Sequence, residues 1–239
     1  MFDGKRIICI VPCYNELYKI NKVVSKVEKN IVDTVLIVDD GSTDGSPEIA
    51  RRLGATTVAM GRAQGVGAAI RKGIEYAIAK KYDIIVIIAG NNKDNPKEIK
   101  RLLIPLTQKK YDFVQGSRFL KRGYYGKMPF YRNLAPRLHP IIFSIITRKR
   151  ITESSNGFRA FKTTIFKDKR INIWQKWLDK YALEPYLYYK AVTLGYKTTE
   201  VPVTKVYPNK NLGYTKMKPI VGWWSIFQPL FYLSLQLRR

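Results

Sequence analysis

The fold of this 239-residue chain is decided by the stretch Val35-Leu-Ile-Val-Asp-Asp-Gly-Ser-Thr-Asp-Gly-Ser46. Its first four residues are apolar and mostly β-branched, and so short a run is typical of a buried parallel strand. Asp39 and Asp40 follow directly, and the residues after them favour a tight turn and a helix cap. Open α/β sheets bind ligands at the carboxyl ends of their strands. The two carboxylates therefore indicate either a polar-ligand site or a capped turn with solvated acids.

A second buried strand is predicted at residues 6–11, and it ends in Pro12-Cys-Tyr-Asn-Glu16. One strand ending in Val-Pro-x-Tyr-Asn-Glu, then a helix, then a strand ending in Val-Asp-Asp-Gly-Ser-Thr-Asp resembles the inverting family 2 glycosyltransferases of GT-A fold. The resemblance implies that these strand ends hold the base and ribose of a nucleotide-sugar donor. The residues that would do so here are Pro12, Tyr14, Glu16, Asp39 and Asp40.

Strand and helix patterns continue to alternate, which predicts a mostly parallel, doubly wound α/β sheet flanked by helices. The glycine-rich segment 61–67 opens a helix and favours either phosphate binding or close helix–sheet packing. Within the resemblance, it belongs to a glycine and alanine block that spans residues 65–73. We place Gly67, Gly90 and Asn91 among the donor-binding residues.

The span 118–150 holds nine lysines or arginines and no acid. In it and beyond it the chain resembles the polyprenyl-phosphate sugar synthases of the dolichol-phosphate mannose synthase type, above all in Ser154-Ser-Asn-Gly-Phe-Arg-Ala-Phe161. The resemblance extends over about residues 6–206. It implies that Arg118, Arg132 and Lys205 contact donor or acceptor phosphates, and a guanidinium suits that role because it can donate two parallel hydrogen bonds.

The chain departs from the family where an Asp-x-Asp-x-Gln motif normally holds a divalent metal. The aligned positions are Ala89, Asn91 and Lys93. Mg²⁺ or Mn²⁺, the cofactor that the resemblance implies, prefers oxygen ligands with charge, so Asn91 is a weak candidate ligand. Lys93 is instead a candidate for neutralising the leaving group, and Asp94 is a further candidate catalytic residue in the same loop.

The net charge of +25 predicts an anionic partner, such as nucleic acid, an acidic membrane surface or a phosphorylated substrate. The carboxylates at the strand ends argue against nucleic acid, because they would repel its backbone. Cys9 and Cys13 are expected to be reduced, half-buried thiols. The first residues contain no signal-peptide apolar region, which predicts the cytoplasm or the cytoplasmic face of a membrane.

Residues 219–237 form an uncharged, aromatic-rich tail between basic residues. Its length and its proline favour an interfacial amphipathic helix, and packing on the domain is the alternative. We therefore divide the chain into a GT-A domain at 1–218 and a membrane-associating tail at 219–239. Within the domain, the nucleotide-binding half covers about 1–118 and the acceptor half about 119–218.

Three functions follow from these patterns. The first is an inverting glycosyltransferase that moves a sugar from a nucleotide diphosphate to a polyprenyl phosphate. This acceptor is already an anion and needs no strong base. The second is transfer to a hydroxyl of a surface glycan or lipid-linked sugar, with Asp94 or Glu153 as base. The third is a nucleic-acid-binding protein. His139 is expected to be structural, and Arg159 is a candidate structural ion-pair partner of an acid such as Glu153.

Overall fold

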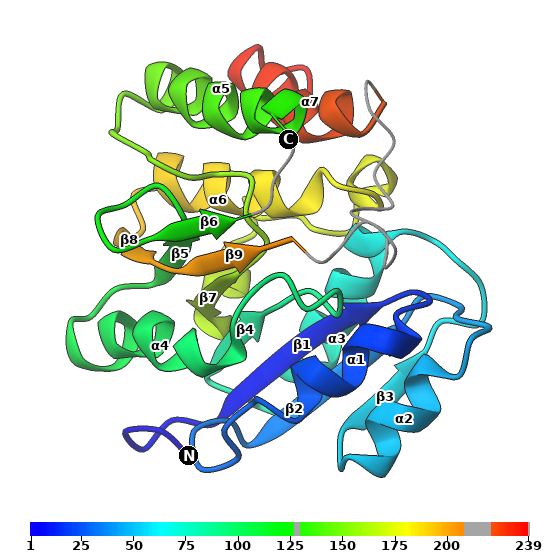
Figure 1. The fold of residues 1–239 in the computed structure, drawn as a ribbon. Coiled ribbons are helices and arrows are strands. Elements are labelled where there is room, and N and C mark those ends of the chain that lie inside the picture. The colour runs from blue at the N-terminus through cyan, green and yellow to red at the C-terminus, as the bar shows by residue number, and fades with distance from the viewer. Residues whose placement is uncertain (127–129, 208–220, 239) are drawn as a thin grey trace.

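The computed structural model describes residues 1–126, 130–207 and 221–238, without the side chains of 130–133 and 221. Besides three short 3₁₀ helices, the elements in chain order are β1 (Ile7–Cys13), α1 (Leu17–Val24), β2 (Thr34–Asp39), α2 (Ser46–Arg52), β3 (Thr56–Ala59), α3 (Val66–Ala79), β4 (Ile84–Ile87), α4 (Ile99–Gln108), β5 (Phe113–Ser117), β6 (Tyr124–Gly126), α5 (Phe130–Thr147), β7 (Arg159–Lys162), α6 (Leu183–Thr193), β8 (Thr198–Pro202), β9 (Thr204–Val206) and α7 (Val221–Ser234) (Figure 1).

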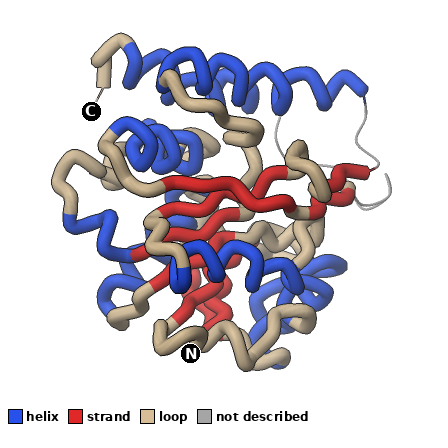
Figure 2. The backbone as a smooth tube through the Cα atoms, turned by 90° about the vertical axis from the view of Figure 1, so that its left-hand side faces the viewer, coloured by secondary structure: helices blue, strands red, loops and turns tan. Residues whose placement is uncertain are grey.

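The central sheet has seven strands in the order β3-β2-β1-β4-β7-β5-β8. All neighbours are parallel except β7, which runs antiparallel between β4 and β5. β6 and β9 form a separate parallel pair beside it. Figure 2 shows the sheet from the side, with helices along both of its faces. The predicted mostly parallel, helix-flanked α/β sheet is confirmed.

The strands are apolar throughout because both faces of the sheet are covered. Along β1, Ile8 and Ile10 pack into the core under α3 and α6, whereas Ile7, Cys9 and Val11 pack under α1 and α4. This alternation follows from the two-residue period of a strand, which turns successive side chains to opposite faces. Both cysteines are free and buried rather than half-buried.

The C-terminal helix α7 lies beside α5 at one end of the molecule (Figure 1) and packs on α5 and α6. Leu230 and Leu233 of α7 are buried in the core. His139 of α5 holds the arrangement, with its ring nitrogens 2.6 Å from Ser154 Oγ and 3.1 Å from the carbonyl oxygen of Ile226. Burial lowers the pKa of His139 to about 4. This neutral, fully buried ring agrees with the structural role expected for it.

Helix α3 begins against the chain segment that precedes α6. The amide of Gly67 donates to the carbonyl of Lys180 and that of Ala68 to Asp179, at 2.8 and 2.9 Å. A Cβ atom on Gly67 would lie 2.0 Å from the carbonyl oxygen of Leu178. These amides are therefore already engaged, and the geometry at Gly67 corresponds to the close-packing alternative rather than to a phosphate cradle.

Gly67→Ala is expected to destabilise the protein by about 2 kcal/mol or more, because overpacking against a fixed backbone forces the two segments apart. Chemical denaturation measures the change. Lys72→Ala, at an exposed position of the same helix, is the control and should stay within about 0.5 kcal/mol of wild type. Equal stability of Gly67→Ala and wild type would contradict the packing role.

Candidate active site

The carboxyl ends of β1 and β2 lie side by side, and the loops that follow them hold each other. The amides of Asn15, Glu16 and Leu17 donate to the side chains of Ser42, Ser46 and Asp44 at 2.8–2.9 Å. In return, the Asn15 side chain accepts the amide of Thr43. The two strand ends on which the resemblance rests are thus a single interlocked unit, which we call the donor loops (residues 13–17 and 39–46).

Asp39 and Asp40 differ in what they contact. Both carboxylate oxygens of Asp40 accept backbone amides, from Gln64 at 2.7 Å and Gly65 at 2.9 Å. Asp39 accepts the amide of Ser42 at 3.0 Å through Oδ1. Both side chains are largely buried. Asp40 therefore anchors the segment before α3, and Asp39 is the more available of the two for a donor.

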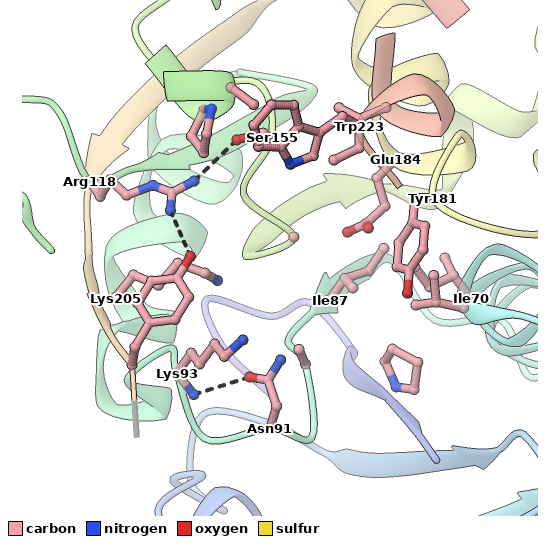
Figure 3. A pocket seen from close by; sticks show the side chains of 18 of the residues that line it. Ile70, Ile87, Asn91, Lys93, Arg118, Ser155, Tyr181, Glu184, Lys205 and Trp223 are labelled. Carbon is pink, nitrogen blue, oxygen red and sulfur yellow. Dashed lines mark hydrogen bonds between the residues drawn. The ribbon is translucent and has the colours of Figure 1, made fainter. Parts of the chain in front are cut away.

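A cavity of about 240 Å³ opens next to the donor loops, and Pro12 at the end of β1 is part of its wall. Its polar side carries residues from the loop after β4, the end of β5, the loop before β7 and β9. An apolar wall comes from α5 and α7, and further apolar residues come from α3 and the end of β4. The residues that line both sides include Asn91, Lys93, Arg118, Ser155, Lys205, Ala135, Pro136, Trp223, Ile226 and Phe227. Figure 3 shows Lys93 and Asn91 facing Trp223 across this space.

Arg118 is buried at the cavity wall and is held by a matched counter-charge. Its Nε atom lies 2.6 Å from Glu153 Oε2, and a second nitrogen donates to Ser155 Oγ at 3.1 Å. Burial opposes ionisation of Glu153, but the Arg118 guanidinium outweighs it and lowers the pKa of this carboxyl. A carboxylate so stabilised is a poor general base.

Lys205 and Asp94 form a second buried pair, with Nζ 2.7 Å from Oδ1 and a further bond of 2.8 Å to Asn156. The Asp94 side chain is fully buried and does not line the cavity. The structure thus places Asp94 behind Lys205, where it fixes the ammonium and does not reach a substrate. This position differs from the one that a catalytic base requires.

Lys93 lines the same cavity and is 7% exposed. Its ammonium lies over the ring of Tyr207, 4.7 Å from the ring centroid. Burial, reinforced by the neighbouring Lys205 ammonium, lowers the pKa of Lys93 to about 7. Three of the basic or loop residues singled out from the sequence, Lys93, Arg118 and Lys205, are therefore brought together in one cavity.

Three further residues singled out from the sequence are Gly90, Arg132 and Arg159. Gly90 packs tightly against the end of β1. A Cβ atom on Gly90 would lie 3.3 Å from the carbonyl oxygen of Pro12. The side chain of Arg132 lies outside the described residues, although its backbone belongs to α5. Arg159 is a buried ion-pair partner of an acid, as expected, but that acid is Glu184 and not the suggested Glu153. Glu153 binds Arg118, and Arg159 instead donates to the carbonyl of Glu184, whose carboxylate is 4.0 Å away.

Four polar residues that line the cavity were not predicted as site residues. Glu184 lies in the first turn of α6 and Tyr181 just before that helix, Ser155 precedes β7, and Tyr207 follows β9. Burial raises the pKa of Glu184, although Arg159 counteracts this. Ser155 belongs to the block 154–161 that carries the family resemblance, and Glu184 matches a later block of that resemblance, so both carried a signal. No local motif marked Tyr181 or Tyr207.

The site does not fit a carboxylate-bound divalent metal. Among the described residues, no three histidine, cysteine, aspartate or glutamate side chains converge as a metal site requires. Of the aligned positions, Ala89 has no ligand atom and Lys93 carries a positive charge. Asp94 does keep one buried oxygen without a hydrogen-bond partner. That oxygen lies beside the Lys205 ammonium, which opposes a cation.

Comparison with known proteins agrees with this geometry. The fold is that of a GT-A glycosyltransferase. Glucosyl-3-phosphoglycerate synthase from Mycobacterium tuberculosis, solved with Mn²⁺ and UDP, superposes with a TM-score of 0.69 at 18% identity over 95% of this chain and 81% of its own. Residues 8–170 match the family described as Glycosyl transferase family 2. The chain belongs to that family and is a glycosyltransferase.

Two curated relatives extend the match over most of the chain. Glycosyltransferase AglJ of Haloferax volcanii is 30% identical over 225 residues, covering 94% of this chain and 71% of its own. Polyprenol monophosphomannose synthase of Mycolicibacterium smegmatis is 26% identical over 220 residues, covering 89% and 81%.

The buried Lys93 predicts a specific pH dependence of stability. Its pKa is about 7 in the folded protein and 10.5 in an exposed lysine, so between these values the unfolded chain binds more protons at this position. Wild-type stability should therefore rise from pH 7 to about 10 relative to Lys93→Met, which lacks the titrating group. Calorimetry measures both melting temperatures. Exposed Lys97→Met should follow wild type, and parallel curves for wild type and Lys93→Met would refute the prediction.

Proposed function

We propose that this glycosyltransferase moves a sugar from a nucleotide-diphosphate sugar to the phosphate of a polyprenyl phosphate, with inversion. The observation that carries the proposal is the two-sided cavity. Lys93, Arg118 and Lys205 line its polar side, and apolar residues of α5 and α7 line the other. A lipid phosphate has the same two-sided chemistry. The relative from Mycolicibacterium smegmatis is named for a polyprenol monophosphate product, which supports this acceptor class.

The donor loops would hold the nucleoside, and the cavity would hold the reacting phosphates. An oxygen of the acceptor phosphate attacks C1 of the sugar, and the bond from C1 to the diphosphate oxygen breaks on the opposite face. The nucleoside diphosphate leaves with the bonding electron pair. Because the attacking oxygen is anionic at neutral pH, no proton has to be removed. Catalysis then rests on positioning and on fixed positive charge.

Within this scheme Arg118 and Lys205 bind the acceptor phosphate, and Asp94 positions Lys205. Arg132, which lies within the basic span 118–150, is proposed to contact a phosphate as well. Asp39 accepts a hydrogen bond from the donor's ribose or base, with Tyr14 and Glu16 on the same loops. No step is assigned to a divalent metal, because the aligned positions do not fit one.

Transfer to a sugar hydroxyl needs a free carboxylate base, and the two bases expected from the sequence do not supply one. Glu153 is bound to Arg118 and Asp94 to Lys205, at 2.6 and 2.7 Å. Membership of an enzyme family also favours catalysis over nucleic-acid binding as the role of the positive charge.

Asp39→Asn is expected to weaken donor binding at least about tenfold, because hydrogen bonds to a charged group contribute about 1.5–3 kcal/mol. The amide oxygen can still accept from Ser42, so the loop should keep its shape. A thermal-shift screen of UDP-, GDP-, CDP- and dTDP-sugars identifies the donor, and calorimetry then measures its affinity. Exposed Glu48→Gln is the control. Undiminished affinity in Asp39→Asn would contradict the donor assignment.

We further propose that the enzyme works peripherally on the cytoplasmic face of a membrane. Among the described residues, no helix is long and apolar enough to span a bilayer. The outer faces of α5 and α7 carry large exposed apolar side chains, and the cations at 148–150 follow α5 directly. The exposed apolar residues are Leu134, Leu138, Ile141 and Ile145 of α5, Trp224 and Phe231 of α7, and Leu235 and Leu237 just beyond it.

This membrane surface predicts binding to liposomes that contain anionic lipid, with affinity falling as salt rises. The fourfold variant Ile141→Ser, Ile145→Ser, Trp224→Ser and Phe231→Ser should bind much more weakly in a sedimentation assay. Deleting α7 is a poorer test, because Leu230 and Leu233 belong to the core. Tyr18→Ser, at an exposed aromatic on α1, is the control. Equal binding by the fourfold variant and wild type would refute this surface.

A further inference from the structure

Lys93 stands out among the described residues that line the cavity because no carboxylate bonds to its ammonium. Within the described part of the chain, its ammonium makes no hydrogen bond or ion pair, and its contact is the ring face of Tyr207. Yet the residue is 93% shielded from water. A buried charge to which no carboxylate is bonded is unfavourable, and an anion that binds beside it would relieve that cost.

The other two cations lining the cavity are already matched. Arg118 lies 2.6 Å from Glu153, and Lys205 lies 2.7 Å from Asp94. These pairs are close to neutral as units and can bind a phosphate through their remaining donors. Lys93 supplies the uncompensated positive charge of this group, which is the charge that a multiply ionised ligand needs.

The backbone turn in the loop after β4 also directs Lys93 toward the cavity. The Asn91 side chain accepts the amide of Lys93 at 3.2 Å, and Asn92 adopts a left-handed φ of 54° between them. After this turn, Lys93 lines the cavity. Asp94 is instead fully buried and binds Lys205. The loop therefore presents a cation, and no carboxylate, to the cavity.

The position of Lys93 lies between the two halves of the proposed site. β4 is the neighbour of β1 in the sheet, and β1 carries the first donor loop. Pro12, at that strand's end, and Lys93 line the same cavity. A donor whose nucleoside sits on the donor loops would extend its diphosphate past Pro12 toward Lys93.

We propose that Lys93 is a resident cation that binds the donor's diphosphate and stabilises the nucleoside diphosphate as it leaves, in place of a divalent metal. The inference rests on the proposed function and deepens it. An ammonium offers three donors in a water-poor site, where a fixed charge interacts more strongly with developing negative charge than in water.

The test compares nucleoside diphosphates with the matching monophosphates, because only the former present a β-phosphate. Calorimetry at one fixed pH, in EDTA, measures the affinities of UDP, GDP, CDP and dTDP and of their monophosphates. Wild type should bind one diphosphate in EDTA and prefer it to its monophosphate. In Lys93→Met this preference should fall at least tenfold, with the monophosphate affinity unchanged.

Two further variants separate charge from shape. Lys93→Arg should keep most of the preference, because it retains the charge. Lys97→Met removes an exposed lysine four residues further on and should behave as wild type. Turnover in EDTA should remain a substantial fraction of that with Mn²⁺ in wild type, and should fall by orders of magnitude in Lys93→Met.

The outcomes distinguish this inference from the proposed function. If wild type binds the diphosphate only with Mn²⁺, and Lys93→Met behaves alike, the lysine has no such role and the glycosyltransferase proposal stands. If the diphosphate preference in EDTA is the same in both proteins, the inference is also overturned. If wild type binds no nucleoside diphosphate with or without Mn²⁺, the proposed function itself fails.

Discussion

Basic side chains held away from water surround the candidate active site, and their need for counter-charge determines how the surrounding loops fold. Glu153 binds Arg118 and also accepts the amides of Ser155 and Asn156. Asn156 in turn accepts from Lys205. One network thus ties the end of β5 and the loop before β7 to β9, and through Asp94 to the loop after β4. Removing one partner of such a buried pair typically costs about 3–5 kcal/mol, so the network is both a scaffold and a binding surface.

The elements that the sequence predicted well are those with a strong local signal. The strands predicted at 6–11 and 35–38 are largely apolar runs followed by turn residues, and they correspond to β1 and β2 of the sheet. β7 carried no such signal. Its four residues include Arg159 and Lys162, and its partners β4 and β5 lie far away along the chain. Helix α5 also has a weak sequence signal, because Pro136 and Pro140 both fall inside it.

The candidate site shows the same contrast between residues with a local sequence signal and contacts that form only across the fold. Lys93, Arg118 and Lys205 were singled out by motif and charge, and they do share one cavity. Which acid neutralises which base could not be predicted, because that depends on distances across the fold. Arg118 and Glu153 are 35 residues apart, and Lys205 and Asp94 are 111 apart. The same limit explains Gly67, where a glycine pattern typical of phosphate loops instead permits close backbone contact with residues 178–180.

Helices α5 and α7 line the cavity with one face and expose apolar side chains on the other. Their inner faces, through Pro136, Ile226 and Phe227, form its apolar wall, while Ile141 and Trp224 are exposed on the outside. The layer is anchored from within by His139, which bonds to Ser154 beside the cavity and to the backbone of α7. A layer that is apolar on both sides is unfavourable in water unless something apolar covers its outer face. The same two helices would then separate a lipid phase from the buried cations, so that only an acceptor with an apolar chain and an anionic head could satisfy both sides of the layer.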